Sequence, residues 1–293
     1  MRRKTTAVRI GNVVLSSEEP VLVQSMLNTS TREVDACVEQ AIRIIEAGGR
    51  LVRITAPGVK EAEMLGEIHR RLRERGYTTP ISADIHFVAE AASVAARYVE
   101  KVRINPGNFA DKRATFKKLT YTDEEYAAEL EILRQKFTEF LEVCRQYGTA
   151  VRIGTNHGSL SDRIMSRYGD TPAGMVEATM EDLRVCQACD FKDVVISLKS
   201  SDCRTMVDAV RLLVEKMEAE GMCYPLHLGV TEAGEGEDGR IRSAVGIGTL
   251  LNEGIGDTIR VSLTEEPEAE IPVACELARI CSEPEYLKGW TPL

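Results

Sequence analysis

Short runs rich in β-branched residues alternate along the whole chain with longer amphipathic runs, and this alternation limits the fold more than any other feature of the sequence. A strand, a helix and a further strand in succession form a parallel pair joined by a right-handed crossover. Eight runs are strand-like, at residues 21–26, 50–55, 81–86, 101–106, 150–155, 193–199, 225–231 and 258–263. Helical patterns lie near residues 33–48, 60–75, 88–98, 123–147, 172–188, 203–221, 241–252 and 267–281. Eight such units predict an α/β fold of the (β/α)₈ TIM-barrel class. A doubly wound open sheet is the alternative, although it usually has fewer strands.

The length of 293 residues suits one such barrel, because these folds use about 250 residues as a single domain. Segment 107–149 is longer than a normal connection and contains one long amphipathic helix. We therefore expect a long, decorated crossover between the fourth and fifth strands. Residues 1–281 are expected to form the barrel domain, and residues 282–293 a tail that leads toward a missing C-terminal part.

The charge and the apolar runs exclude several classes of protein. A net charge of −9 argues against binding to nucleic acid or to a membrane surface, because both require a basic field. No apolar run approaches the roughly 18–20 residues of a membrane span, and the basic start is not followed by the apolar core of a signal peptide. The 8 scattered cysteines are expected to be free thiols. We expect a cytoplasmic protein.

A tripeptide of the form apolar-Arg-apolar recurs in four of the expected strands, and its arginines are Arg53, Arg103, Arg152 and Arg260. Side chains alternate between the two faces of a strand. The flanking Val and Ile residues would face the helices, so each arginine faces the barrel interior. The same parity turns further polar residues inward: Gln24, Thr55, Ser82, Asp84, His86, Asn105, Ser197, Lys199, His227, Thr231 and Ser262.

These residues would make the barrel interior cationic, whereas barrel interiors are normally filled with branched apolar side chains. The four arginines and Lys199 face only two acidic residues, Asp84 and Glu232. Uncompensated buried charge is costly, and guanidinium groups match phosphate oxygens in two-point geometry. We therefore expect an anionic ligand at the C-terminal ends of the strands. The alternative is a set of internal ion pairs, in which Asp84 and Glu232 neutralise at most two arginines.

Three further features have both a functional and a structural interpretation. The glycine-rich stretch 229–256 follows the seventh strand and predicts a phosphate-binding loop or, alternatively, a flexible lid. Glu232 could act as a general acid or base, or as a counter-ion to a neighbouring arginine. Lys199 could form a Schiff base if its pKa were lowered.

The candidate metal ligands of the chain are weak. Asp84 and His86 share a face at the end of the third strand, and Asn156 and His157 follow the fifth, but 4 histidines without a His-Glu-x-x-His spacing argue against zinc and favour contacts to a substrate. Cys186 and Cys189 form a lone Cys-x-x-Cys inside a helical stretch, and an iron–sulfur cluster usually needs more thiolates. We interpret them as two small helix residues.

Seven ordered motifs resemble the 4-hydroxy-3-methylbut-2-enyl diphosphate synthase family, in its long three-domain form of plants and some bacteria. They are PVLVQSMLNTST (20–31), ADIHF (83–87), KVRINPGN (101–108), RIGTNHGSL (152–160), YGDTP (168–172), LHLGVTEAG (226–234) and SAVGIGTLLNEGIGDTIRVSLT (243–264). The resemblance covers about residues 5–281.

The resemblance implies a barrel that binds 2-C-methyl-D-erythritol 2,4-cyclodiphosphate in the methylerythritol phosphate route of isoprenoid biosynthesis. It implies an oxidoreductase that opens this ring by a two-electron reductive dehydration, with a four-iron four-sulfur (4Fe-4S) cluster on a C-terminal domain and electrons from ferredoxin or flavodoxin. The family's diphosphate contacts fall on Arg53, Arg103, Asn105, Arg152, Lys199, Arg260 and Ser262. Asp84, Asn156 and His227 resemble further pocket residues, and Glu232 matches the acid near the substrate hydroxyl.

One departure concerns the cluster. The family's cluster-binding cysteines lie beyond the barrel, and Cys186 and Cys189 do not match their position. The expectation is that this chain alone binds the substrate but does not catalyse its reduction, and that it holds no metal. Two other functions remain open, a Schiff-base lyase or aldolase that uses Lys199 on a phosphorylated substrate, and a diphosphate-binding module without chemistry.

Overall fold

The structure, a computed structural model, describes residues 2–85, 88–110 and 120–282. The tail expected at 283–293 and the last two residues of the ADIHF motif lie outside the described residues.

Eight parallel strands form the centre of the molecule and confirm the predicted barrel. The strands are β3 (Leu22–Met26), β4 (Leu51–Thr55), β5 (Ile81–Asp84), β6 (Lys101–Ile104), β7 (Ala150–Asn156), β8 (Val194–Lys199), β9 (His227–Leu228) and β10 (Thr258–Ile259). They pair in the order β8-β7-β6-β5-β4-β3-β10-β9. A parallel bridge between Ile196 and Leu226 then joins β8 to the chain just before β9, so the sheet closes on itself.

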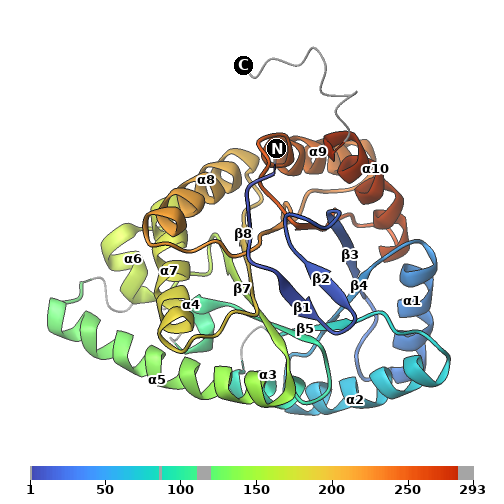
Figure 1. Cartoon of the computed structure of the whole chain (residues 1–293), viewed down its shortest axis with the longest axis horizontal. Helices are drawn as coiled ribbons and strands as arrows, with labels where there is room; N and C mark the ends of the chain where they lie inside the picture. The colour runs from blue at the N-terminus through green and yellow to red at the C-terminus, as the bar shows by residue number, and fades with distance from the viewer. Residues whose placement is uncertain (1, 86–87, 111–119, 283–293) are drawn as a thin grey trace.

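Helices surround this sheet, as Figure 1 shows. They are α1 (Val34–Glu46), α2 (Val59–Glu74), α3 (Ala89–Ala95), α4 (Pro106–Phe109), α5 (Asp123–Tyr147), α6 (Asp162–Tyr168), α7 (Pro172–Ala188), α8 (Cys203–Ala219), α9 (Gly236–Asn252) and α10 (Glu270–Ser282), with a 3-10 turn at Pro267–Ala269. The Val and Ile residues beside each inward arginine, such as Val52 and Ile54, pack against the helices in one continuous core. This is the packing that strand parity predicts.

The expected decorated crossover is the segment that contains α4 and the 25-residue helix α5. Thr122 and Glu125 form a reciprocal capping box at the start of α5, and Gly148 ends it in the left-handed conformation. The apolar face of α5 buries Phe137 and Phe140 against the barrel. The local sequence therefore sets both ends of this helix.

An N-terminal hairpin that the sequence patterns did not predict covers one end of the barrel. Strands β1 (Val8–Ile10) and β2 (Val13–Leu15) pair antiparallel across a turn at Gly11. They cross the barrel opening in Figure 1. Alternate residues of the hairpin pack against Leu22, Leu51, Ala150 and Val195, which are inward-facing residues near the N-terminal ends of four strands. The hairpin therefore closes the end of the barrel opposite to the C-terminal strand ends.

The glycine-rich stretch after β9 divides into a short connection and a helix. Helix α9 begins at Gly236, so Gly246 and Gly248 lie inside the helix, as the helical pattern at 241–252 predicts. A Cβ at Gly246 would lie 2.6 Å from a methyl carbon of Val230. Gly246 therefore allows α9 to approach the barrel closely. The seventh and eighth expected strands are also shorter than predicted, with two paired residues each.

The hairpin generates a first prediction. Ile10 is 1% exposed in the cluster that closes the barrel, whereas Val14 on the same hairpin is 38% exposed. Ile10→Ala should lower the free energy of unfolding by about 2–5 kcal/mol, because it removes buried methyl groups and leaves a cavity. Val14→Ala should change it by less than about 0.5 kcal/mol. Urea denaturation measures both free energies of unfolding. A loss for Ile10→Ala as small as the one expected for Val14→Ala would show that the hairpin does not stabilise the barrel.

Candidate functional site

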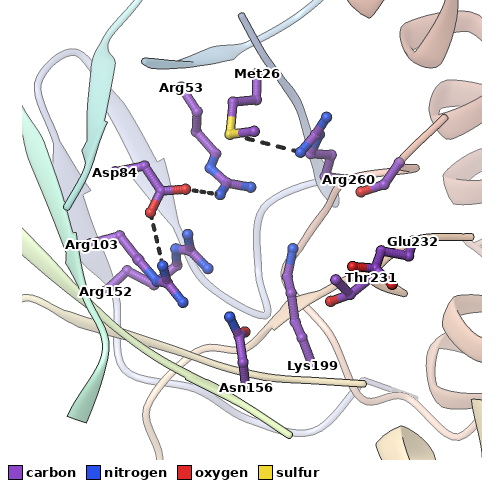
Figure 2. A pocket seen from close by; sticks show the side chains of 11 residues that line it. Met26, Arg53, Asp84, Arg103, Arg152, Asn156, Lys199, Thr231, Glu232 and Arg260 are labelled. Carbon is purple, nitrogen blue, oxygen red and sulfur yellow. Dashed lines mark hydrogen bonds and ion pairs between the residues drawn. The ribbon is translucent and has the colours of Figure 1, made fainter. Parts of the chain in front are cut away.

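A polar pocket of about 200 Å³ opens at the C-terminal ends of the strands. Met26, Asp84, Asn156 and Lys199 are each the last residue of a strand, which places their side chains around one opening. The complete lining is Met26, Arg53, Asp84, Arg103, Arg152, Asn156, Lys199, Thr231, Glu232, Arg260 and Ser262. Figure 2 shows that basic side chains from several strands converge on this space.

Three of the arginines are held by buried carboxylates. Asp84 is 2% exposed and accepts hydrogen bonds from Nη2 of Arg53 and, at 3.0 Å, from Nη1 of Arg103. Glu270, at the start of α10, accepts from Nε and Nη2 of Arg260, each at 2.9 Å. These charge-assisted bonds fix the direction in which the guanidinium groups point.

Arg152 and Lys199 have no carboxylate partner among the described residues. Nη1 of Arg152 donates to Oγ of Ser197 at 2.7 Å, while its Nε and Nη2 are buried without a partner. Lys199 is 8% exposed, and its amine points into the pocket in Figure 2. The pocket therefore has an excess of positive charge that the described carboxylates do not neutralise.

Burial lowers the pKa of Lys199 well below its ordinary value, and the positive charges of Arg53 and Arg152 lower it further. An arginine does not lose its proton in a protein, so the lysine is the group that responds to this crowding. Two glycines leave room for these long basic side chains inside the barrel. A Cβ at Gly229 would lie 3.0 Å from Nζ of Lys199, and one at Gly154 would lie 2.5 Å from Nε of Arg103.

Glu232 lies on the opposite side of the pocket from Asp84 (Figure 2). Its backbone has a φ of 54°, a left-handed conformation that is uncommon for a residue other than glycine. Such strain tends to occur at functional positions. Among the described residues Glu232 forms no ion pair with the arginines, so the structure does not support the counter-ion interpretation.

The structure brings together most of the residues that the sequence indicated. These are Arg53, Asp84, Arg103, Arg152, Asn156, Lys199, Glu232, Arg260 and Ser262. Two others are outside the pocket lining. The side chain of Asn105 accepts a hydrogen bond from the backbone of Gly107 and caps α4. His227 is completely buried and bonds to Gln24 in the barrel interior. Contact of these two residues with a ligand stays a prediction.

Sequence reasoning missed Met26, which lines the pocket, and Glu270, which is the partner of Arg260. Glu270 gave no local signal, because it approaches Arg260 only when α10 packs beside β3. Met26 could have been found, since it is two residues beyond the inward-facing Gln24 and shares its face. Asp84 and Glu270 together form hydrogen bonds with three arginines, although their two negative charges balance only two of the positive charges.

The described residues contain no group of three or more His, Cys, Asp or Glu side chains that could hold a metal ion. Cys186 is buried in α7 and Cys189 caps the end of that helix, as the sequence predicted. Burial raises the pKa of the Cys186 thiol well above its ordinary value, which disfavours the thiolate that a metal would need. Within the described ranges, no helix combines the length and hydrophobicity needed to cross a bilayer.

Comparisons with known proteins agree with the predicted family. The family model described as the GcpE TIM-barrel domain matches residues 5–275. A Parabacteroides distasonis protein named 4-hydroxy-3-methylbut-2-en-1-yl diphosphate synthase (flavodoxin) is 63% identical over 97% of this chain and 46% of its own length. The chloroplastic ferredoxin counterpart of Arabidopsis thaliana is 52% identical over 96% of this chain and 38% of its own length. The chain therefore spans less than half the length of these relatives.

Solved structures share the fold at low sequence identity. Dihydropteroate synthase of Yersinia pestis is 13% identical with a TM-score of 0.58, over 94% of this chain and 99% of its own. An N-acetylneuraminic acid synthetase of Leptospira borgpetersenii is 10% identical with a TM-score of 0.60, over 100% of this chain and 93% of its own. At these identities the similarity shows the barrel fold alone.

The shared carboxylate of Asp84 generates a second prediction. Asp84→Asn should lower the free energy of unfolding by about 3–5 kcal/mol, because two buried guanidinium groups lose their common counter-charge. Added inorganic pyrophosphate should recover part of the loss if anions occupy the pocket. Glu74→Gln, which removes an exposed partner of Arg70, is the control and should leave the urea midpoint unchanged. An unchanged midpoint in Asp84→Asn would contradict this account.

Proposed function

Because the chain belongs to the GcpE TIM-barrel domain family, we propose that it is the substrate-binding barrel of a 4-hydroxy-3-methylbut-2-enyl diphosphate synthase. Its ligand would be 2-C-methyl-D-erythritol 2,4-cyclodiphosphate, and the whole protein would open this ring by reductive dehydration. The observation that carries the proposal is the convergence of five basic side chains on one pocket, two of which have no carboxylate partner among the described residues.

The chain's own residues divide the work of binding. Arg53 is held by Asp84 and Arg260 by Glu270, which fixes how their guanidinium groups face the pocket, while Arg103 is held by both Asp84 and the carbonyl of Gly154 and contributes mainly its charge. Arg152 has no carboxylate partner among the described residues, and two carboxylates serve the other three arginines, so positive charge remains unbalanced. A ligand with two negative phosphate groups removes this imbalance, which favours a diphosphate over a neutral sugar.

Two other lining residues would contact the rest of the ligand. Met26 is the one aliphatic hydrophobic side chain among the residues that line the pocket, and its Sδ lies 3.8 Å from Nη1 of Arg260. It would pack against the carbon skeleton. Glu232 has no ion-pair partner among the described residues and could hold or release a proton at a hydroxyl of the ligand. These roles for Met26 and Glu232 are proposals.

Reductive ring opening consumes two electrons, and the family resemblance implies a four-iron four-sulfur cluster that delivers them. The described residues do not fit such a cluster, because they contain no group of three or more candidate ligands. We propose that its ligands belong to the part of the longer relatives that this chain does not match. Flavodoxin or ferredoxin, which the names of the relatives specify, would be the donor. We also propose a cytoplasmic location, consistent with eight free cysteines.

One observation favours a second function. A buried lysine with a lowered pKa is a suitable nucleophile for Schiff-base chemistry, and Lys199 is such a lysine. The cyclic diphosphate has no carbonyl group with which to form an imine. Reduction with borohydride in the presence of a phosphorylated carbonyl compound therefore separates the two functions, because only a lyase or aldolase would be trapped covalently at Lys199.

The central test is calorimetric titration with the cyclic diphosphate. Arg152→Met should weaken binding by about 2–3 kcal/mol, because charge-assisted hydrogen bonds to the phosphate are lost without orphaning a carboxylate. Arg260→Ala is less suitable, since it would leave Glu270 buried and unpaired. Arg9→Met, on the exposed side of the hairpin, is the control and should bind like the wild type. An unchanged affinity in Arg152→Met would remove this residue from the site.

Met26 allows a separate prediction about the carbon skeleton. Met26→Gln should weaken binding of the cyclic diphosphate by about 1–2 kcal/mol, because an amide replaces an apolar contact of one or two methylene groups. Binding of inorganic pyrophosphate should not change. Met26→Leu preserves the apolar surface and serves as the control. Equal losses for both ligands would place Met26 against phosphate and not against carbon.

A further inference from the structure

A second layer of polar side chains lies inside the barrel, between the pocket and the hairpin that closes the other end. Gln24, Ser82, Lys101 and His227 belong to it, and each is completely buried. Lys101 is the first residue of β6 and pairs in register with Ser82 and Ala150. It is two residues before Arg103, so both side chains face inward.

The amine of Lys101 has no hydrogen-bond partner among the described residues, although the residue is 0% exposed. Within the same described part of the chain, Oγ of Ser82, which pairs in register with Lys101, and Oε1 of Gln24 also lack partners. Glu100, the preceding residue of the chain, faces the other way and binds His69 and Arg73. Lys101 is therefore a buried amine that forms no ion pair with a carboxylate of the described residues.

The charged groups around Lys101 make its protonation unfavourable. Arg53 on β4, Arg103 on β6 and Arg152 on β7 lie one layer above it, with Lys199 on β8 at the pocket; the imidazole of His227 faces it from β9. The one carboxylate in reach is Asp84 on β5, which already binds two guanidinium groups. Burial lowers the pKa of Lys101 well below its ordinary value, with Arg152 and Arg53 adding to the effect and Asp84 opposing it.

A diphosphate in the pocket would change this balance. The ligand would place negative charge beside Arg53 and Arg152, the same groups that repel a proton from Lys101. Guanidinium groups keep their protons, whereas a lysine can gain or lose one. Binding of the anion and protonation of the lysine therefore favour each other, and this coupling is reciprocal.

We propose that Lys101 is a proton-binding site coupled to the ligand pocket: it is neutral in the empty barrel and takes up a proton when the diphosphate binds. The proposal rests on the proposed function for the identity of the ligand. Lys101 touches no ligand and acts through the arginines, so it is a positioning residue for charge and not a catalytic one. The negative charge of the ligand makes the protonated amine less unfavourable than it is in the empty barrel.

Calorimetric titrations in buffers of different ionisation enthalpy count the protons taken up on binding. Each phosphorus of the cyclic diphosphate has one acidic oxygen, ionised throughout the neutral range, so exchanged protons come from the protein. We expect Lys101→Met to take up about one proton fewer than the wild type. Uptake of one proton makes the affinity of the wild type fall about tenfold for each unit by which the pH rises. In Lys101→Met this pH dependence should be weaker by about that factor. Lys60→Met, an exposed lysine on α2, is the matched control.

Lys199 and His227 could also take up protons, and the comparison with Lys101→Met separates their share. An unchanged proton count in Lys101→Met would overturn the proposal, as would a wild type that takes up no proton. If the methionine variant fails to fold, Lys101→Gln replaces it. In the wild type, Nζ chemical shifts of ¹⁵N-labelled lysine should show one buried amine that becomes charged on addition of ligand.

A second measurement needs no ligand. In the window between the lowered pKa of folded Lys101 and the ordinary lysine value of about 10.4, the unfolded chain binds one more proton than the folded chain. Wild-type stability should therefore fall as the pH falls through this window. Lys101→Met should have a higher Tm than the wild type at pH 7, and the difference should disappear near pH 10.4. If calorimetry detects no binding of the cyclic diphosphate, the result contradicts the proposed function alone. Equal Tm values of the wild type and Lys101→Met at pH 7 would contradict the proposal that Lys101 is neutral in the empty barrel.

Discussion

The barrel interior holds more buried positive charge than the carboxylates around it can neutralise, and the rest of the site follows from this imbalance. A typical barrel of this class fills its interior with branched apolar side chains. Here the inward positions carry Arg53, Lys101, Arg103, Arg152, Lys199 and Arg260, opposed by Asp84, Glu232 and Glu270. Such an interior is stable only if its cations share counter-charges, lose protons or bind an anion. Asp84 and Glu270 supply the shared counter-charges. We propose that Lys101 loses its proton in the empty barrel and that the pocket binds a diphosphate anion.

The two ends of the barrel have opposite roles. At one end the hairpin of β1 and β2 packs against Leu22, Leu51, Ala150 and Val195 and supplies the apolar packing that the polar interior lacks. At the other end the strand termini leave an open pocket of about 200 Å³. The electrostatic cost of the polar layers is therefore balanced by apolar burial at the hairpin and between strands and helices. This separation lets a folded barrel keep a charged site without a ligand.

The ion pairs show how the site is oriented before a ligand arrives. Asp84 and Glu270 bind three guanidinium groups that line the pocket, and the backbone carbonyl of Gly154 accepts a further hydrogen bond from Arg103 at 2.8 Å. A buried ion pair of this kind contributes little net stability, but it restricts the rotamers of long side chains. Orientation reduces the entropy lost on binding. The same carboxylates thus serve the fold and the recognition of an anion.

The sequence by itself determined the barrel class, because eight alternating units permit few other topologies, and it determined the inward face of each strand, because side chains alternate strictly. Nine expected site residues consequently lie together in the pocket, and the GcpE family assignment agrees with the motifs around them. Tertiary structure alone decided the partner of Arg260, since Glu270 reaches it from a helix that packs beside a distant strand. It also decided that His227 and Asn105 bond within the protein, that the glycines of α9 serve helix packing, and that a hairpin closes the barrel. Parity fixes which face a side chain takes, but its depth along the barrel axis and its partners across the interior depend on the register of strands and helices that are far apart in the chain.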